Sequence, residues 1–441
     1  MNIIEFIKRQ VKNLFSSKTV ENIYHTDTAV SDTMSSYISL WERMYSGKAS
    51  WIDNDEIISL RLEQAIVREF VNITLNEMTA SISDKRLDKI YQKAIENLNI
   101  NLQKGLTSGA MVIKPVNSDT VQYIPQSAFI PIEYDINGKL TKVIFPEIKR
   151  ISDFEYLIRF EYHSLDIING LTITNRASRS SSPDVLGKEI LLSSVPEWSN
   201  LNETISYPLM KRQAFGYYVN PIANNIDNSK MGVSIFESAR ELIKKADIQF
   251  GRLDWEFKSG ERRINADVTA FAKDEKGNPI ISDRLYRAFD ITQLFQEFSP
   301  VLRETNYING LEEYKRNIEF NVGLSYGDIS NPNTVEKTAT EIKSAKKRKY
   351  NTVTAIQKNL KSCLDDLAYA FAFYNSLATS DYGFVCSFRD SILVDDETER
   401  NQDIQDLRLG IMRPEEYRAK WYSETLEQAV QNLPQSAEVI E

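Results

Sequence analysis

The feature that most constrains this fold is a helical pattern running through residues 337–374. Apolar residues recur there at the spacing of one helix face, at Ile342, Ala345, Val353, Ile356, Leu360, Leu364, Leu367, Phe371 and Tyr374. A helix of about 40 residues, or ~60 Å, exceeds the usual length in a globular domain. The pattern therefore predicts a structural spine or an assembly surface.

The same stretch carries much positive charge for an acidic chain. The protein has 441 residues and a formal net charge of -9, which argues against a general nucleic-acid-coating protein. Residues 337–361 nevertheless contain eight Lys or Arg and one acid, whereas residues 381–441 contain fourteen acids and six Lys or Arg. The question that follows is which group, in this protein or in another molecule, neutralises the positive charge of the basic helix.

Composition is that of a folded globular protein, with 42% hydrophobic and 26% charged residues. The length allows two to four domains. Cys363 and Cys386 have neither metal-type nor redox-type spacing, so we expect a reducing, cytosolic compartment. We expect no signal peptide and no transmembrane segment, because no apolar run approaches ~20 residues.

Residues 2–15 (NIIEFIKRQVKNLF) predict a basic amphipathic helix. Its apolar positions are Ile3, Ile4, Ile7, Val11, Leu14 and Phe15, and its basic positions are Lys8, Arg9 and Lys12. Such a helix binds a membrane surface or a partner's groove, or it packs on its own protein. Packing on its own protein is the commoner outcome for a terminal helix.

The rest of the pattern predicts an α+β, multi-domain chain. Helices are predicted over residues 55–79 and 85–108, and strands across residues 110–196. Asn137-Gly138 is a strong hairpin signal between two of those strands.

A helix–strand–helix unit follows. Residues 233–258 and 303–321 predict two helices that flank short strands between residues 264 and 290, and residues 322–336 predict a polar loop. The unit is typical of a hairpin stalk with a small β tip. One face of the first helix carries acids, with Glu237, Glu241, Asp247 and Asp254 among them.

Signals for catalysis are weak. The chain has two histidines and lacks both GxxxxGK[ST] and a GxGxxG that follows a strand. Residues 227–237 only faintly resemble a calcium loop, because the fifth position of the loop has no oxygen ligand and the Glu comes too early. Asp395-Asp396 fits a solvated acidic face better than a Mg²⁺ site. We therefore expect no enzyme, no cofactor and no metal.

Several segments together resemble one protein family. Residues 220–264 resemble the stem region of portal proteins from tailed bacteriophages, of the siphophage and prophage type of Gram-positive hosts. Residues 323–367 (GLSYGDISNPNTVEKTATEIKSAKKRKY and onward) are similar to the region where that family's tunnel loop leads into a long wing helix. Residues 388–399 (FRDSILVDDETE) and 414–417 (PEEY) also fit. The resemblance covers about residues 30–430.

The resemblance implies a portal fold that assembles into a ring, usually of twelve subunits, at one capsid vertex. The large terminase subunit would pump double-stranded DNA through the channel, and the DNA would later leave by the same route. Further implied partners are a head–tail adaptor and the major capsid and scaffolding proteins, and the protein would reside in the virion after assembly in the bacterial cytoplasm. The implied parts are an N-terminal helix (1–20), a wing (21–231), a first stem helix (232–259), a clip (260–300), a second stem helix (301–321), a tunnel loop (322–336), a long wing helix with a returning strand (337–394) and a crown (395–441) that is short for the family.

The resemblance also implies which surfaces meet DNA. A channel must let DNA slide, so polar uncharged loop residues and an acidic stem face suit it better than many phosphate contacts. The loop residues concerned are Ser330, Asn331, Asn333 and Thr334. The basic residues either contact DNA, pair with acids of a neighbouring subunit or form a solvated face, and they are Lys343, Lys346, Lys347, Arg348 and Lys349.

Two alternatives remain open from the sequence. The chain is another ring-forming head–tail connector or baseplate protein, or it is a Mg²⁺-dependent enzyme that acts on nucleic acid. The enzyme would be a monomer or dimer stabilised by metal, whereas a portal would be a large closed ring.

Overall fold

The computed structural model mixes helices (44%) and sheets (24%), which confirms an α+β chain. It divides into two compact units, residues 1–387 and 388–441, and each is described by itself. The structure describes residues 28–53, 55–182, 187–280, 286–289, 295–332, 339–375, 382–388, 396–422 and 426–433. The N-terminal helix predicted over residues 2–15 lies outside them.

The first four helices that the structure describes are α3 (Asp32–Tyr45), α4 (Leu62–Leu75), α5 (Lys85–Ile95) and α6 (Leu98–Ser108). The helix predicted over residues 55–79 is too long, because Asp53 accepts the N–H groups of residues 55–57 and Arg61 is left-handed with φ 57°. The helix predicted over residues 85–108 is two helices. The break lies between Ile95 and Leu98, next to Ala94, whose carbonyl accepts the Tyr123 hydroxyl.

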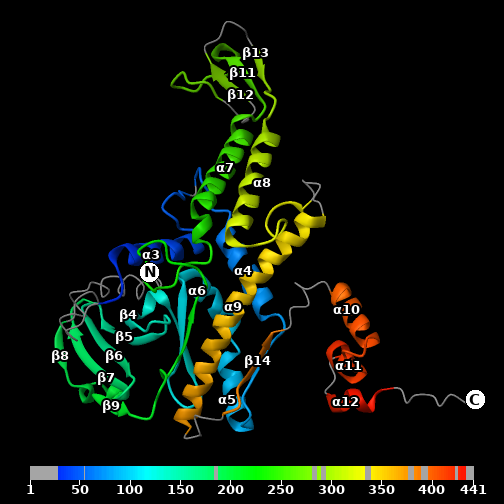
Figure 1. Ribbon diagram of the computed structural model, residues 1–441. Helices are drawn as coiled ribbons and strands as arrows, with labels where there is room; N and C mark the ends of the chain where they lie inside the picture. The colour runs from blue at the N-terminus through cyan, green and yellow to red at the C-terminus, as the bar shows by residue number, and fades with distance from the viewer. Residues whose placement is uncertain are drawn as a thin grey trace, which may run out of the picture. The chain divides into compact units, whose positions relative to one another are not determined.

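Two antiparallel sheets form the β-rich part of this unit (Figure 1). The smaller has the order β10-β2-β3 and consists of β10 (Gly216–Val219), β2 (Ala110–Pro115) and β3 (Val121–Pro125). The larger has the order β4-β5-β6-β7-β8, with β9 paired to β7, and its strands are β4 (Ile130–Tyr134), β5 (Leu140–Ser152), β6 (Glu155–Asp166), β7 (Gly170–Ser180), β8 (Lys188–Ile190) and β9 (Thr204–Tyr207). The hairpin predicted at Asn137-Gly138 is confirmed, with Gly138 at φ 82° between β4 and β5.

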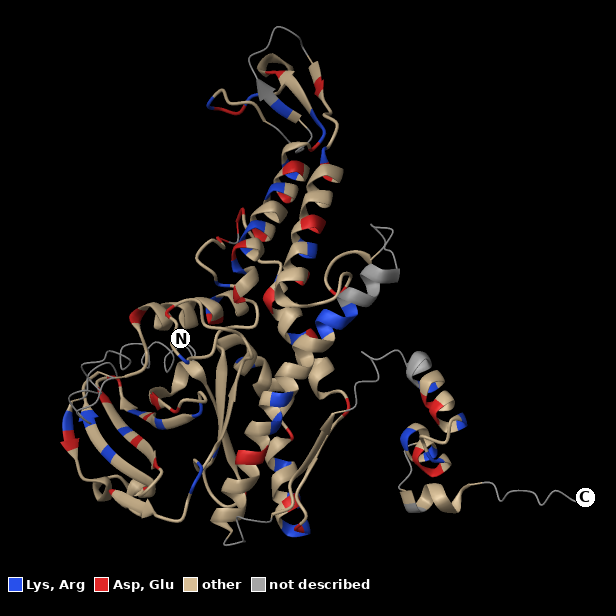
Figure 2. Cartoon of the chain, in the orientation of Figure 1, with Lys and Arg blue, Asp and Glu red and all other residues tan. Residues whose placement is uncertain are grey.

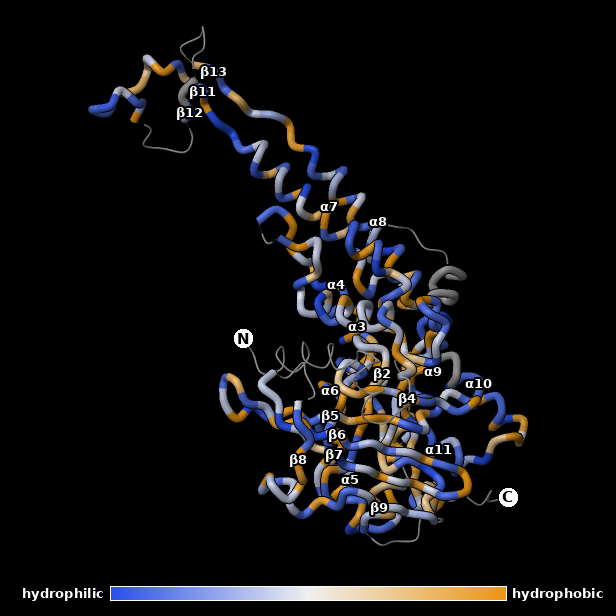
Figure 3. The backbone as a smooth tube through the Cα atoms, turned by 90° about the vertical axis from the view of Figure 1, so that its left-hand side faces the viewer, coloured by the Kyte–Doolittle hydropathy of each residue, from blue (hydrophilic) through white to orange (hydrophobic). Residues whose placement is uncertain are grey.

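Two helices, α7 (Arg240–Ser259) and α8 (Glu304–Val322), lie side by side in Figures 1 and 3. At their far end the chain forms a small sheet with the order β12-β11-β13, made of β11 (Arg263–Asp267), β12 (Tyr286–Phe289) and β13 (Phe295–Phe298). The predicted helix–strand–helix unit is thus present. We call α7 and α8 the stem.

The first stem helix begins later than the sequence predicts. The pattern indicates a helix from residue 233, but α7 begins at Arg240 after a short 3-10 turn. The backbone groups of residues 232–235 are already engaged elsewhere, because the side chains of Gln126 and Asn220 and the Leu106 carbonyl bind them. A backbone held in this way cannot also form a helical ladder.

The long helix is confirmed. It is α9 (Ala339–Tyr374), with 36 residues, so it spans about 54 Å. Its apolar line lies in the core of the first unit, and the fully buried members are Val353, Ile356, Leu360, Leu364, Leu367 and Phe371. A two-stranded sheet of β1 (Met78–Ser81) and β14 (Val385–Phe388) completes this unit.

The second unit is helical in the part that the structure describes. It contains α10 (Asp396–Arg408), α11 (Pro414–Tyr422) and α12 (Leu426–Gln431). The indole N–H of Trp421 donates to Asp403 at 2.8 Å and ties α11 to α10. In neither unit do the described residues include a helix long and apolar enough to cross a membrane.

Candidate nucleic-acid interface

Lys and Arg gather on one part of α9 (Figure 2). These basic residues divide into two pairs with different surroundings. Lys346 and Lys347 are exposed. Lys349 is buried, and its Nζ lies 2.8 Å from Oε1 of Glu69 and 3.0 Å from Oδ2 of Asp328. The side chain of Lys343 is not among those that the structure describes.

Arg348 is also engaged within the subunit. Its guanidinium lies over the rings of Phe320 and Tyr326, 4.7 and 5.3 Å from their centroids, and donates to the Leu324 carbonyl at 3.2 Å. Arg348 and Lys349 thus hold the segment after α8 against α9. The burial of Lys349 is at odds with the three roles predicted for the basic group, whereas the roles of the partly exposed Arg348 stay predictions. The sequence could not show the pairing of Lys349, because Glu69 lies 280 residues away.

The segment that follows α8, residues 323–332, is organised around one buried carboxylate. Glu319 is completely buried, and its Oε1 accepts the N–H groups of Gly327, Ile329 and Ser330 at 3.1, 2.6 and 2.8 Å. Its Oε2 accepts the Ser330 hydroxyl at 2.8 Å. A carboxylate that satisfies four donors fixes the path of the chain.

This arrangement corrects one predicted DNA-facing residue. Ser330 is only 5% exposed, and its hydroxyl is used by Glu319. Asn331 is exposed, and its N–H donates to Glu312 at 2.7 Å. Asn333 and Thr334 lie outside the described residues. Among the predicted loop residues that are described, Asn331 therefore presents its side chain to solvent, and Ser330 anchors the segment.

The predicted acidic stem face is wrong for two of its four members. Asp247 is 1% exposed and accepts the Trp51 indole N–H at 2.9 Å and the Leu60 N–H at 2.8 Å. Glu237 precedes α7 and accepts the indole N–H of Trp41 at 2.5 Å. Glu237 thereby joins the start of the stem to α3, and Asp247 joins α7 to the segment between α3 and α4.

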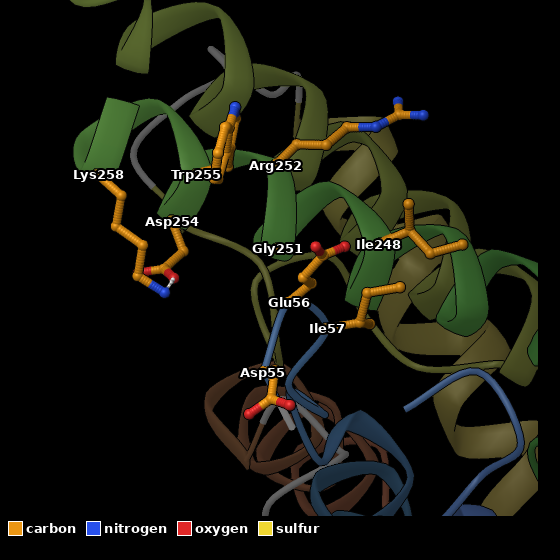
Figure 4. Close-up of a pocket in the computed structure, with 9 residues that line it drawn as sticks. All are labelled: Asp55, Glu56, Ile57, Ile248, Gly251, Arg252, Asp254, Trp255 and Lys258. Carbon is orange, nitrogen blue, oxygen red and sulfur yellow. Dashed lines mark ion pairs between the residues drawn. The ribbon is translucent and has the colours of Figure 1, made fainter. Parts of the chain in front are cut away.

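The other two acids lie nearer solvent and pair along their own helix. Glu241 is 3.1 Å from Arg240, and Asp254 is 2.5 Å from Lys258. Figure 4 shows the Asp254–Lys258 pair beside the place where residues 55–57 cross α7. A Cβ on Gly251 would lie 2.4 Å from the Glu56 carbonyl oxygen, so only glycine allows this crossing.

A polar stripe on α8 was missed by the sequence analysis. Its members are exposed and recur every three or four residues, at Asn306, Asn309, Glu313, Asn317 and Asn321. Asn317 donates to Glu313, and Asn321 donates to the Asn317 carbonyl, which holds the amides along the helix. The one acid of the stripe, Glu313, pairs with the neighbouring Arg316 at 3.6 Å. The helical repeat of asparagine is the signal that would have found it.

A further carboxylate at the base of the stem is buried without a full set of partners. Glu63 on α4 is 1% exposed, and its Oε2 has no hydrogen-bond partner. Burial raises the pKa of Glu63 from about 4.5 to about 8, and the charge of Asp247 adds to this. Burial likewise raises the pKa of Asp247, against the hydrogen bonds from Trp51 and Leu60.

This buried acid gives a pH prediction. The folded chain holds the Glu63 proton up to about pH 8, whereas the unfolded chain releases it near pH 4.5, so stability falls as the pH rises between those values. Glu63→Gln should remove that loss and raise the melting temperature at pH 8 by about 4 °C. The gain should shrink toward pH 5. Calorimetry measures this, with exposed Glu56→Gln as the control, and an equal gain at pH 5 and pH 8 would contradict it.

The buried histidine belongs to a structural cluster. His163 is 1% exposed, and its Nε2 lies 2.7 Å from Glu161, which also pairs with Lys114 at 2.7 Å. Burial lowers the pKa of His163. Within the described ranges no three His, Cys, Asp or Glu side chains lie close enough together to hold a metal ion.

Comparison with known proteins adds no relative. No protein-family model matches the chain, and no curated protein matches it.

Proposed function

We propose that this chain is a bacteriophage portal protein, a ring-forming channel through which DNA enters a capsid and later leaves. The observation that carries the proposal is the order of its parts. A two-helix stem with a small β tip is followed by an anchored polar segment and then by a 36-residue helix. The segments that resemble portal proteins are the ones that build this series.

The chemistry of the stem suits a channel. Each phosphate that a Lys or Arg neutralises adds affinity through released counterions, and a ring multiplies each contact. The α8 stripe offers amides and one acid, and the neighbouring Arg316 is paired with that acid, Glu313, at 3.6 Å. We propose that this stripe faces the DNA, because it can make weak polar contacts without holding phosphates.

The base of the stem is suited to bear load. Glu237 and Asp247 bind the indoles of Trp41 and Trp51, and Glu319 fixes the start of the segment that would narrow the channel. Hydrogen bonds to buried carboxylates are stronger than neutral ones and define one geometry. Such a base would keep the stem in place while DNA moves past it.

The experiment that tests the proposal is the native mass of the purified chain, supported by negative-stain images. Twelve copies of a 50.7 kDa chain would form a closed particle of about 600 kDa with a central hole. A chain that stays monomeric or dimeric at high concentration, and with a scaffolding partner added, would contradict the proposal. Stabilisation by Mg²⁺ would then favour the enzyme alternative.

The exposed lysine pair distinguishes two roles within the ring. Ring interfaces join two different faces, and Lys346 and Lys347 have no ion pair within the described part of the subunit. We therefore expect Lys346→Glu with Lys347→Glu to abolish rings, as native mass would show. Lys89→Glu with Lys93→Glu on the exposed face of α5 is the matched control. Rings that form normally but package DNA poorly would assign the pair to DNA instead.

A further inference from the structure

One face of the six-stranded sheet is buried without a described layer to cover it. Ile144, Ile158 and Phe160 are at most 1% exposed, and Ile130 and Ile132 of β4 extend the same cluster. We call these five residues the outer cluster. The opposite face of β5 packs through Val143 and Phe145 against the smaller sheet.

The cover of the outer cluster must come from another part of the chain. Among the described residues, the hydrophobic side chains that pack on it are Val30, Ile148 and Tyr162, and only Val30 lies outside the sheet. One valine cannot exclude water from five large side chains, each of which gains roughly 1.5–3 kcal/mol from full burial. A further apolar layer is therefore required.

We propose that the N-terminal amphipathic segment, residues 2–15, is that layer and docks on the outer cluster of its own subunit. The chain enters at this place, because the Ala29 N–H donates to the Pro131 carbonyl on β4 at 3.0 Å and Val30 packs on the cluster. Residues 16–27 span at most ~40 Å when extended. That reach exceeds the ~10 Å from β4 to β6.

The sequence of the segment fits the face it would cover. Six apolar residues lie along one side of the predicted helix, and three basic residues lie elsewhere. A helix with such an apolar stripe is stable when the stripe is buried against a core. The face offers isoleucine and phenylalanine, and the basic side would remain in water. This inference does not depend on the proposed portal function.

Hydrogen exchange on the full-length chain tests the proposal. We expect the amides of residues 4–15 to exchange at least 100-fold more slowly than in an unstructured peptide, at every protein concentration and without lipid. Ile7→Asp with Val11→Asp should abolish that protection and increase the fluorescence of a hydrophobic dye several-fold. Lys8→Ala with Lys12→Ala, on the polar side, should change neither the exchange protection nor the dye fluorescence.

Three results would overturn the proposal. Fast exchange of residues 4–15 in the unaltered chain would show that the segment is not docked, whether or not the double-Asp variant folds. Protection that requires vesicles of anionic phospholipid would assign the segment to a membrane surface. Protection that grows with protein concentration would assign the cover to a second copy of the chain.

Discussion

Replacing Glu319 by alanine is expected to release the segment from Leu324 to Asn331 and to lower the free energy of unfolding by about 3 kcal/mol. The carboxylate is completely buried and accepts three backbone N–H groups and one hydroxyl. Without it, these donors remain buried and unsatisfied, or the segment opens to water. Either outcome removes the ordered approach to the proposed channel constriction.

Two measurements check this result. Calorimetry should show the loss of stability, and limited proteolysis should show new cleavage between residues 324 and 331. Glu319→Gln keeps one oxygen acceptor, so this variant should lose much less stability than Glu319→Ala. Glu313→Ala on the exposed side of the same helix should have little effect. If all three variants resist proteolysis equally, Glu319 does not hold the segment.

The second large effect is expected at Gly232. A Cβ at this position would lie 2.1 Å from the Gly109 carbonyl oxygen, and this neighbour is backbone that cannot rotate away. Gly232→Ala should therefore force apart the end of α6 and the approach to the stem. We expect a loss of about 3 kcal/mol in the free energy of unfolding, because the clash can be relieved only by moving the backbone.

The damage should extend to the hydrogen bonds around the clash. Gln126 binds both the N–H and the carbonyl of Gly232, and Asn220 binds the Leu106 and Val233 carbonyls. Thermal unfolding and native mass measure the result. Gly310→Ala is the matched control, since it lies on α8, where an added Cβ would make only an ordinary contact, at 3.4 Å, with the end of the Gln249 side chain, and it should be neutral or slightly stabilising. Equal melting temperatures for the two variants would contradict this account.

Much of the fold could be predicted from local patterns. The apolar line of α9 and the Asn137-Gly138 hairpin each depend on neighbours a few residues apart, and both are confirmed. The two stem helices and the β tip also followed from such patterns. The start of α7 did not, because distant side chains hold the backbone of residues 232–235.

Residue spacing by itself determined the type of most segments, helix or strand, because both periodicities depend on residues close together in the sequence, but it did not determine where α4 and α7 begin or that residues 85–108 form two helices. Only the tertiary structure decided what each charged residue does. From the sequence, Lys349 is predicted to be a surface charge, but in the structure it pairs with Glu69 of α4. Asp247 is predicted to be an exposed acid, but it accepts hydrogen bonds from Trp51 and Leu60. The physical reason is that the energy of a charge depends on its burial and its partners, and here these come from parts of the chain more than a hundred residues away.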